Sequence, residues 1–124
     1  MEIFKTRRFD RWAHSEELTD KMLTLAVAEM NSGLVDASLG GGVYKKRVAK
    51  LGHGKSGSYR TLLAFKLRDK AFFMYGFSKN QRENITSREL VALKRYASEL
   101  FGYSELQLNK ALKNGELIEV KYDE

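Results

Sequence analysis

The sequence predicts an α+β domain in which helices flank a central group of strands. Three observations support this class: an amphipathic helical pattern in the first third, alternating and aromatic runs in the middle third, and two further helical patterns near the end. The 124 residues match the length of one domain, so we expect a single domain over 1–124. With 43% hydrophobic residues, the chain can build a core without disulfides.

The first third predicts one short strand and two helices. Residues 2–5 alternate as a strand does, and the apolar positions of 7–15 recur at helical spacing. Thr19 is a suitable N-cap for a second, amphipathic helix, and Gly33 follows that helix as a stop signal. Residues 34–39 fit neither pattern and receive no assignment.

The middle third predicts three strands. Residues 43–50 combine Val and Tyr with basic side chains, and a glycine loop at 51–57 follows them. Residues 59–66 and 71–77 are separated by a short turn at 67–69, which predicts an antiparallel hairpin. The last of these runs is aromatic at both alternating sets of positions, so we expect it in the middle of the sheet.

The final third predicts two helices and a short strand. Thr86 or Ser87 begins an amphipathic helix that Gly102 ends. Ser104 begins a shorter helix, and residues 117–121 form the final strand.

The composition excludes several classes of protein. The chain has no cysteine, which rules out a disulfide scaffold, a cysteine nucleophile and a thiolate metal site. No apolar run approaches the roughly 18 residues that a membrane-spanning helix needs. Residues 1–10 lack the hydrophobic stretch of a signal peptide. We therefore expect a cytoplasmic protein with no membrane partner.

The positive charge is concentrated in the middle of the chain. Residues 43–82 carry 11 basic side chains against one acidic side chain, Asp69, for a net charge of +10. Residues 1–42 and 83–124 each carry a net charge of −2. Such a segment repels itself unless it binds a polyanion, and nucleic acid is the obvious candidate.

Residues 52–57 match two nucleotide-binding motifs only superficially. GHGKSG has the spacing G-x-G-x-x-G, and its Gly-Lys-Ser resembles the end of a P-loop. Both motifs bind phosphate at the N-terminus of a helix that follows the glycines. A strand is predicted to follow here, so we interpret the glycines as a hairpin loop that can close over a polymer.

Strand alternation brings cations from neighbouring strands together. Arg60 is predicted on the sheet face opposite Tyr59, and the same alternation puts Phe73, Tyr75 and Phe77 on one face of the next strand. Adjacent strands lie about 5 Å apart, so their cations can converge on one phosphate. Three tyrosines offer stacking surfaces for bases; they are Tyr44, Tyr59 and Tyr75. A core position is the more common alternative for Tyr59, and Tyr44 could take either role.

Other polar residues of this region have competing interpretations. We expect Lys46 and Lys66 to be solvated, and Asn84 to be either a ligand or a turn residue. His53 lies among glycines and lysines and can exchange protons near neutral pH. The basic region contains no pair of carboxylates, which argues against a metal-dependent nuclease and predicts no metal site.

Four segments together resemble toxins of the RelE/ParE superfamily, and the HigB-like branch most closely. They are YKKRVAK at 44–50, GHGKSGSYR at 52–60, FMYGFSKN at 73–80 and NI at 84–85. Ser58 departs from that branch, which usually has a glycine there. The resemblance implies a RelE-like fold, a small twisted antiparallel sheet with helices packed on one side.

The resemblance also implies a function. Such toxins of type II toxin–antitoxin pairs cut messenger RNA, commonly on the ribosome, without metal or cofactor. A cognate antitoxin, typically of the helix-turn-helix type, neutralises them. The substrate's own 2′-OH is the nucleophile, and the products carry 2′,3′-cyclic phosphate and 5′-OH ends. Two alternatives stay open: a ParE-like toxin that acts on DNA gyrase, and a non-catalytic RNA-binding module.

The family's activity maps onto the basic region of this chain. The expected catalytic residues are Arg60, Lys55, Lys79, Arg82 and His53. The expected RNA-binding residues are Lys45, Arg47, Lys50, Tyr44, Tyr75 and Asn84. Arginine suits bidentate contact with phosphate. Lys50, Lys55 or His53 can serve as the general base, with Tyr75 a weaker candidate, and the sequence does not choose among them.

Overall fold

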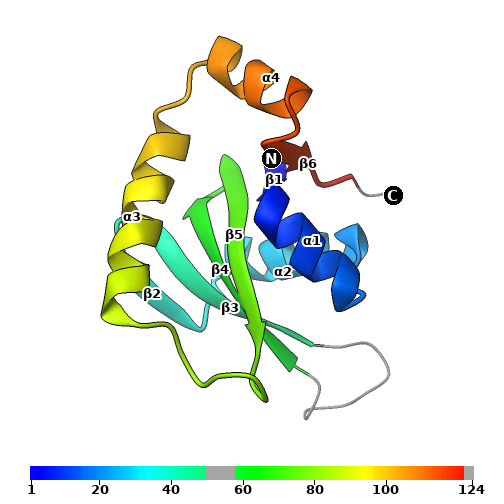
Figure 1. Cartoon of the computed structure of the whole chain (residues 1–124), viewed down its shortest axis with the longest axis vertical. Helices are drawn as coiled ribbons and strands as arrows, with labels where there is room; N and C mark the ends of the chain where they lie inside the picture. Colours follow the sequence, from blue (N-terminus) through cyan, green and yellow to red (C-terminus); the bar gives the residue numbers. More distant parts are fainter. Residues whose placement is uncertain (50–57, 122–124) are drawn as a thin grey trace.

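A computed structural model describes residues 1–49 and 58–121, which form four helices and six strands (Figure 1). In chain order they are β1 (Glu2–Thr6), α1 (Arg7–Ser15), α2 (Asp20–Asn31), β2 (Ala37–Gly40), β3 (Val43–Ala49), β4 (Ser58–Lys66), β5 (Lys70–Ser78), α3 (Ser87–Phe101), α4 (Glu105–Lys113) and β6 (Leu117–Glu119). The predicted α+β class is confirmed. The unassigned stretch 34–39 contains the start of β2, an edge strand.

The helices begin at the predicted caps. The hydroxyl of Thr19 accepts a hydrogen bond from the Met22 amide at 3.3 Å, and that of Thr86 accepts one from the Glu89 amide at 3.1 Å. Ser104 caps α4 in the same way. Each hydroxyl satisfies an amide that the first helical turn leaves without a partner. Of the two caps considered for α3, Thr86 is therefore the one used.

The sheet has the strand order β2-β3-β4-β5-β1-β6, and one of its pairings differs from the expected antiparallel arrangement. β1 runs parallel to β5, from the pair Glu2 and Lys70 to the pair Lys5 and Phe73. Parallel neighbours need a long connection, and the whole segment from α1 to β4 lies between these two strands in sequence. The other four pairings are antiparallel.

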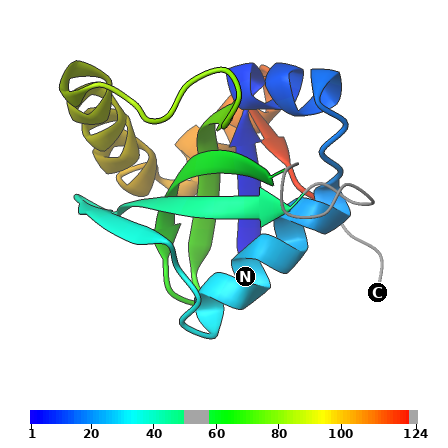
Figure 2. The same cartoon turned by 90° about the horizontal axis from the view of Figure 1, so that it is seen from below.

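The helices cover both faces of the sheet, so the expectation that they pack on one side is wrong. One core contains buried residues of α1 and α2 with Leu63 and Phe73 of the central strands. A second core contains buried residues of α3 and α4 with Ala64 and Phe72 of the same strands. Because β4 and β5 are apolar on both sides, each face needs its own cover (Figure 2).

A β-bulge in β5 changes which face its later residues occupy. Leu63 pairs with Phe73, but Leu62 pairs with Tyr75, so Met74 is an extra residue on β5. The sequence alternation predicted Phe73 and Tyr75 on one face. Phe73 instead packs in the core with α1 and α2, while Tyr75 lies on the face that carries α3.

Gly76 allows α1 to pack closely against the end of β5. A Cβ atom at this position would lie 2.1 Å from Cζ3 of Trp12, so a larger residue would force the indole ring or the strand to move. The Trp12 ring in turn meets the Tyr59 ring edge-on, with centroids 5.5 Å apart. Successive strand residues face opposite sides, so Phe77 lies on the α3 side with Tyr75, and not on the face of Phe73 as the sequence predicted.

Across the described parts of the chain, no helix is both long and apolar enough to cross a membrane.

Candidate functional site

The site begins with two arginines that lie directly opposite each other in the sheet. Arg47 of β3 pairs with Arg60 of β4, and Arg60 pairs in turn with Phe77 of β5. The α-carbons of such neighbours are about 4.5–5.5 Å apart. Arg47 is exposed and Arg60 is half-exposed. Like charges in this arrangement oppose each other and destabilise a sheet.

A second row on the same face adds a cation and an aromatic ring. Lys45 pairs with Leu62, and Leu62 pairs with Tyr75. Side chains two residues apart share a face, so Lys45 and Arg47 lie side by side along β3. We call Lys45, Arg47, Arg60, Tyr75 and Phe77 the basic face. Strand pairing therefore brings together four of the predicted site residues, with Phe77 beside them.

Among the described residues, no carboxylate pairs with a cationic side chain of the basic face, although Asp36 Oδ2 accepts a hydrogen bond from the backbone amide of Arg47. Arg60 Nη1 donates to Ser58 Oγ at 3.1 Å, a neutral contact. In the described parts of the chain, neither Lys45, Arg47 nor Arg60 forms an ion pair. Their charges are thus left for an external anion.

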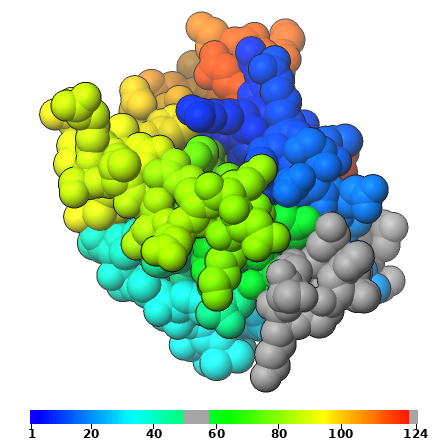
Figure 3. Space-filling model, turned by 60° about the horizontal axis from the view of Figure 1, so that its bottom comes forward, coloured from blue at the N-terminus to red at the C-terminus, as the bar shows by residue number. Residues whose placement is uncertain are grey.

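Arg82 lies in the segment between β5 and α3 and is held by several contacts. Its guanidinium pairs with both carboxylate oxygens of Glu89, at 2.6 and 3.0 Å. It also donates to the Asn84 carbonyl at 2.9 Å and to the Tyr75 hydroxyl at 3.2 Å, and it lies 5.6 Å from the centre of the Phe77 ring. Figure 3 shows this segment on the surface between α3 and α1.

The contacts between Arg82 and Glu89 shift the pKa of both residues. The hydrogen bonds of Arg82 lower the pKa of Glu89 to about 2, with a further contribution from the Thr86 backbone amide. The hydrogen bonds that Arg82 donates to Glu89 and, to a smaller extent, to Tyr75 raise the pKa of Arg82. Arginine has five N–H donors, and four hydrogen bonds here are internal. Arg82 therefore fixes the segment beside the basic face and cannot also grip a phosphate bidentately unless it releases Glu89.

Two other predicted residues lie in the same segment. Lys79 is exposed in the turn directly after Ser78, at the end of the sheet that carries Arg60. Asn84 Oδ1 accepts a hydrogen bond from the Ile85 amide at 2.9 Å. Of the two interpretations of Asn84, this contact supports the turn residue.

Two of the tyrosines considered as stacking surfaces lie away from the basic face. Tyr44 is on the opposite side of β3 and meets the Phe65 ring edge-on at 5.6 Å, against the core of α1 and α2. Tyr59 is buried in that core, and its hydroxyl donates to the Glu16 carbonyl at 3.3 Å. Only Tyr75 is placed beside the cations.

Lys50, His53 and Lys55 lie outside the described residues, as does the predicted glycine loop. The described chain stops at Ala49 and resumes at Ser58, and these two residues pair with each other. Both are two positions from the opposed arginines. The choice among the three possible general bases stays a prediction.

The sequence led us to expect a solvated Lys46, and this prediction is wrong because the residue is buried. Only 6% of it is exposed, and its ammonium pairs with Glu29 of α2 at 2.9 Å and donates to the Leu34 carbonyl at 3.1 Å. The alternation of β3 turns it to the α2 side, where this carboxylate compensates its burial.

Arg8 of α1 is a residue that the sequence reasoning missed. Its guanidinium lies 5.3 Å from the centre of the Tyr75 ring. Arg8, Trp12, Tyr75, Phe77 and Arg82 are among the residues that line a pocket of about 380 Å³ beside the basic face. The indole N–H of Trp12 is buried and has no hydrogen-bond partner among the described residues. The two adjacent arginines at 7–8 could have indicated this site. The acidic residues of 1–42 outweigh them, so the net charge of that segment did not.

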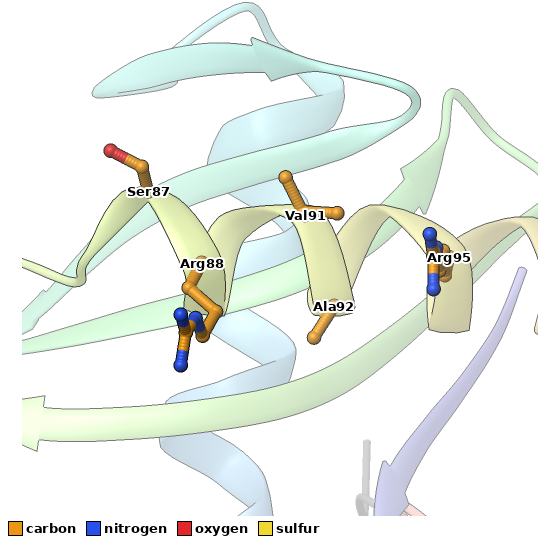
Figure 4. A pocket seen from close by; sticks show the side chains of 5 residues that line it. All are labelled: Ser87, Arg88, Val91, Ala92 and Arg95. Carbon is orange, nitrogen blue, oxygen red and sulfur yellow. The ribbon is translucent and has the colours of Figure 1, made fainter.

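The outer side of α3 carries a separate shallow pocket. Ser87, Arg88, Val91, Ala92 and Arg95 line it from successive turns of the helix (Figure 4). None of these residues lies on the basic face. Within residues 1–49 and 58–121, no three His, Asp or Glu side chains gather as metal ligands would.

A family model described as the RelE toxin of the RelE/RelB toxin–antitoxin system matches residues 1–120. The match covers most of the chain, so the chain belongs to this family. Searches of curated proteins and of solved structures return no match. The chain is thus a RelE toxin of a type II toxin–antitoxin system, which implies a cognate antitoxin, and toxins of this family are generally ribonucleases. The four helices and mostly antiparallel sheet of the described residues are consistent with the RelE fold.

Proposed function

We propose that this toxin is a HigB-like, metal-independent endoribonuclease that cuts messenger RNA on the ribosome. The observation that carries the proposal is the directly opposed pair of Arg47 and Arg60, neither of which has an ion-pair partner among the described residues. Such a pair destabilises the sheet unless an anion binds across it. A phosphodiester is an anion of the right charge and size.

The basic face suits cleavage by the substrate's own 2′-OH. This reaction needs alignment of the 2′-OH with the phosphorus, neutralisation of the charge that develops on the phosphate, and two proton transfers. Arg60 is our candidate for the phosphate contact, because its guanidinium makes one neutral hydrogen bond and keeps other donors available. Lys45 and Arg47 bind the neighbouring phosphates. The general base is Lys50, Lys55 or His53, and Lys79 stays a candidate.

Tyr75 and Arg82 act together in this proposal. The hydrogen bond between them and the Glu89 ion pair hold the segment after β5 against the basic face. Arg82 is thereby a positioning residue in the free protein. Phosphate can contact its remaining N–H without disturbing Glu89.

We propose that the cognate antitoxin silences the toxin by covering this charge. A segment with a net charge of +10 binds nucleic acid in a cell unless a partner occupies it. Addition of the antitoxin should restore translation in an extract that the toxin inhibits. Equal inhibition with and without the antitoxin would contradict this part of the proposal.

One cleavage assay separates the three functions considered. Messenger RNA is incubated with the toxin, with and without programmed ribosomes in magnesium buffer, and the products are resolved on a gel and their ends identified. We expect cleavage that needs the ribosome and leaves 2′,3′-cyclic phosphate and 5′-OH ends, which attack by the substrate's own 2′-OH gives and attack by a metal-activated water does not. A toxin of DNA gyrase leaves the RNA intact and does not retard it. A binding module retards the RNA without cutting it, and either result would overturn the proposal.

A further inference from the structure

A second and larger pocket lies next to the basic face. It has a volume of about 720 Å³, within the range of pockets that hold a nucleotide-sized ligand. The start of α1, the later part of β5 and the inner side of α3 enclose it. The residues that line it are Thr6, Arg7, Arg8, Arg11, Met74, Tyr75, Leu93, Tyr96, Tyr103 and Glu116. Tyr75 is common to this pocket and to the basic face.

Several donors in the pocket have no partner. In the described part of the chain, no hydrogen bond or ion pair involves the side chains of Arg11, Tyr96 or Tyr103. Arg7, by contrast, is already bound to the carbonyls of Gly115 and Asn114. A ligand that carries acceptors would satisfy the three free side chains.

The tyrosines of the pocket are neutral donors beside a carboxylate. Burial, with nearby charges that include Glu116, raises the pKa of both Tyr96 and Tyr103. Their hydroxyls therefore stay protonated near neutral pH. Glu116 itself is exposed and forms no ion pair within the described residues. The pocket thus offers cations, aromatic rings, hydroxyl donors and one anionic acceptor.

We propose that this pocket binds a nucleotide of the substrate RNA next to the phosphate that is cut. Arg8 and Arg11 contact its phosphate, the base lies among the tyrosine rings, and Glu116 accepts hydrogen bonds from the base. Tyr75 and Phe77 are two residues apart, about 7 Å along β5, so RNA bound on the basic face can continue into the pocket. This inference rests on the proposed ribonuclease function and names a subsite of it.

Glu116 distinguishes an RNA base from an acidic peptide as the occupant. An acidic segment of an antitoxin would pair with the arginines but would be repelled by Glu116. A base with adjacent N–H donors satisfies both charges at once. Guanine presents two such donors, N1–H and the N2 amino group, on its Watson–Crick edge, which proteins read in single-stranded RNA. The pocket is therefore expected to prefer guanine over uracil.

Nucleotide titration of the full-length protein tests this assignment. The probes are guanosine 5′-monophosphate and uridine 5′-monophosphate, and the readout is the NMR signals of the Tyr96 and Tyr103 rings. We expect saturable shifts, with guanosine monophosphate binding at least about fivefold more tightly, since a bidentate base contact discriminates by roughly that factor or more. Glu116→Gln should reduce this preference, and Arg11→Ala should weaken binding of both nucleotides. Arg88→Ala removes an equal charge from the outer side of α3 and should change neither.

The outcomes separate the pocket from the proposed activity. Unmoved tyrosine signals, or equal binding of both nucleotides by the wild-type protein, would overturn the inference even if the protein cuts RNA. Shifts caused only by an acidic antitoxin peptide would assign the pocket to that partner and would also overturn it. The predicted titration from a protein that cuts no RNA would leave the nucleotide pocket standing while the proposed function fails.

Discussion

The two faces of the sheet treat neighbouring basic residues in opposite ways. Lys46 and Arg47 are adjacent in sequence, but Lys46 points to α2 and pairs with Glu29, whereas Arg47 lies opposite Arg60 on the α3 side. On the first face Lys5 is likewise paired, with two aspartates. Where the helices supply carboxylates, cations hold the fold together. Where they do not, the cations are left for a ligand, and total charge alone does not distinguish the two cases.

The largest effect on stability is expected from Lys5 on the paired face. Its ammonium lies 2.9 Å from Asp10 and 2.9 Å from Asp20, and only 6% of the residue is exposed. Burial lowers its pKa, but the hydrogen bonds and charges of the two aspartates offset this, so that the pKa is raised. Lys5→Met should lower the free energy of unfolding by about 2–4 kcal/mol, because two carboxylates lose their shared cation. Denaturant unfolding measures the change.

Lys66→Met is the matched control, since this lysine is exposed and forms no ion pair in the described residues. The raised pKa of Lys5 also gives the direction with pH. Its contribution to stability is complete below the ordinary lysine value of 10.5 and is lost as the pH rises through the folded value. A loss no greater than that of the control would show that the Lys5 cluster does not stabilise the fold.

A smaller effect is expected from Arg47 on the unpaired face. Each phosphate contact to single-stranded RNA contributes about 0.7 to the slope of log affinity against log salt concentration. Arg47→Ala should reduce that slope by about 0.7 and weaken binding roughly fourfold near 0.15 M salt. Binding of a short RNA at several salt concentrations measures both quantities.

Lys66→Ala is the control for Arg47→Ala, because it removes a charge from the far end of β4. Lys66 is six positions from Arg60, about 20 Å along the strand. We expect its slope to stay at the wild-type value. Equal slopes for all three proteins would mean that the basic face does not bind phosphate.

The smallest effect concerns the ion pair between Arg82 and Glu89. The pKa of Glu89 is about 2 in the folded protein, below its ordinary value of 4.5. A lowered folded pKa contributes stability above the ordinary value, and this is lost as the pH falls from 4.5 towards 2. Glu89→Gln should remove that part of the acid dependence, and NMR titration of the Glu89 carboxyl should give a midpoint near 2. A midpoint near 4.5 would show that Glu89 is not paired with Arg82 in solution.

The sequence predicts local elements well because their signals are local. The caps Thr19 and Ser104 and the hairpin of β4 and β5 follow from nearby residues and are all confirmed. The bulge at Met74 was missed because it depends on pairing with Leu62 and Leu63 of another strand. One extra residue in a strand reverses the face of every residue after it.

The candidate site was predicted in part for the same reason. Strand alternation correctly places Arg60 and Tyr59 on opposite faces of the sheet. The charge count identifies the segment that carries Arg60. The sequence could not show that Tyr44 and Lys46 face another helix layer, because that requires knowing that helices cover both faces. It also could not show that α1 brings Arg8 to Tyr75, a contact between residues 67 positions apart.

The most direct test of the account compares one cation from each face in two assays. Arg60→Ala and Lys46→Ala are purified, and the thermal midpoint and the RNA cleavage rate of each are measured against the wild type. Loss of a preorganised contact to the scissile phosphate costs about 3–4 kcal/mol, so Arg60→Ala should cleave about 100- to 1000-fold more slowly. Its thermal midpoint should be unchanged or higher, because the opposed arginines no longer repel each other. Lys46→Ala should melt earlier and cleave at the wild-type rate below its melting temperature. The account is contradicted if Arg60→Ala cleaves normally, or if it loses stability as Lys46→Ala does.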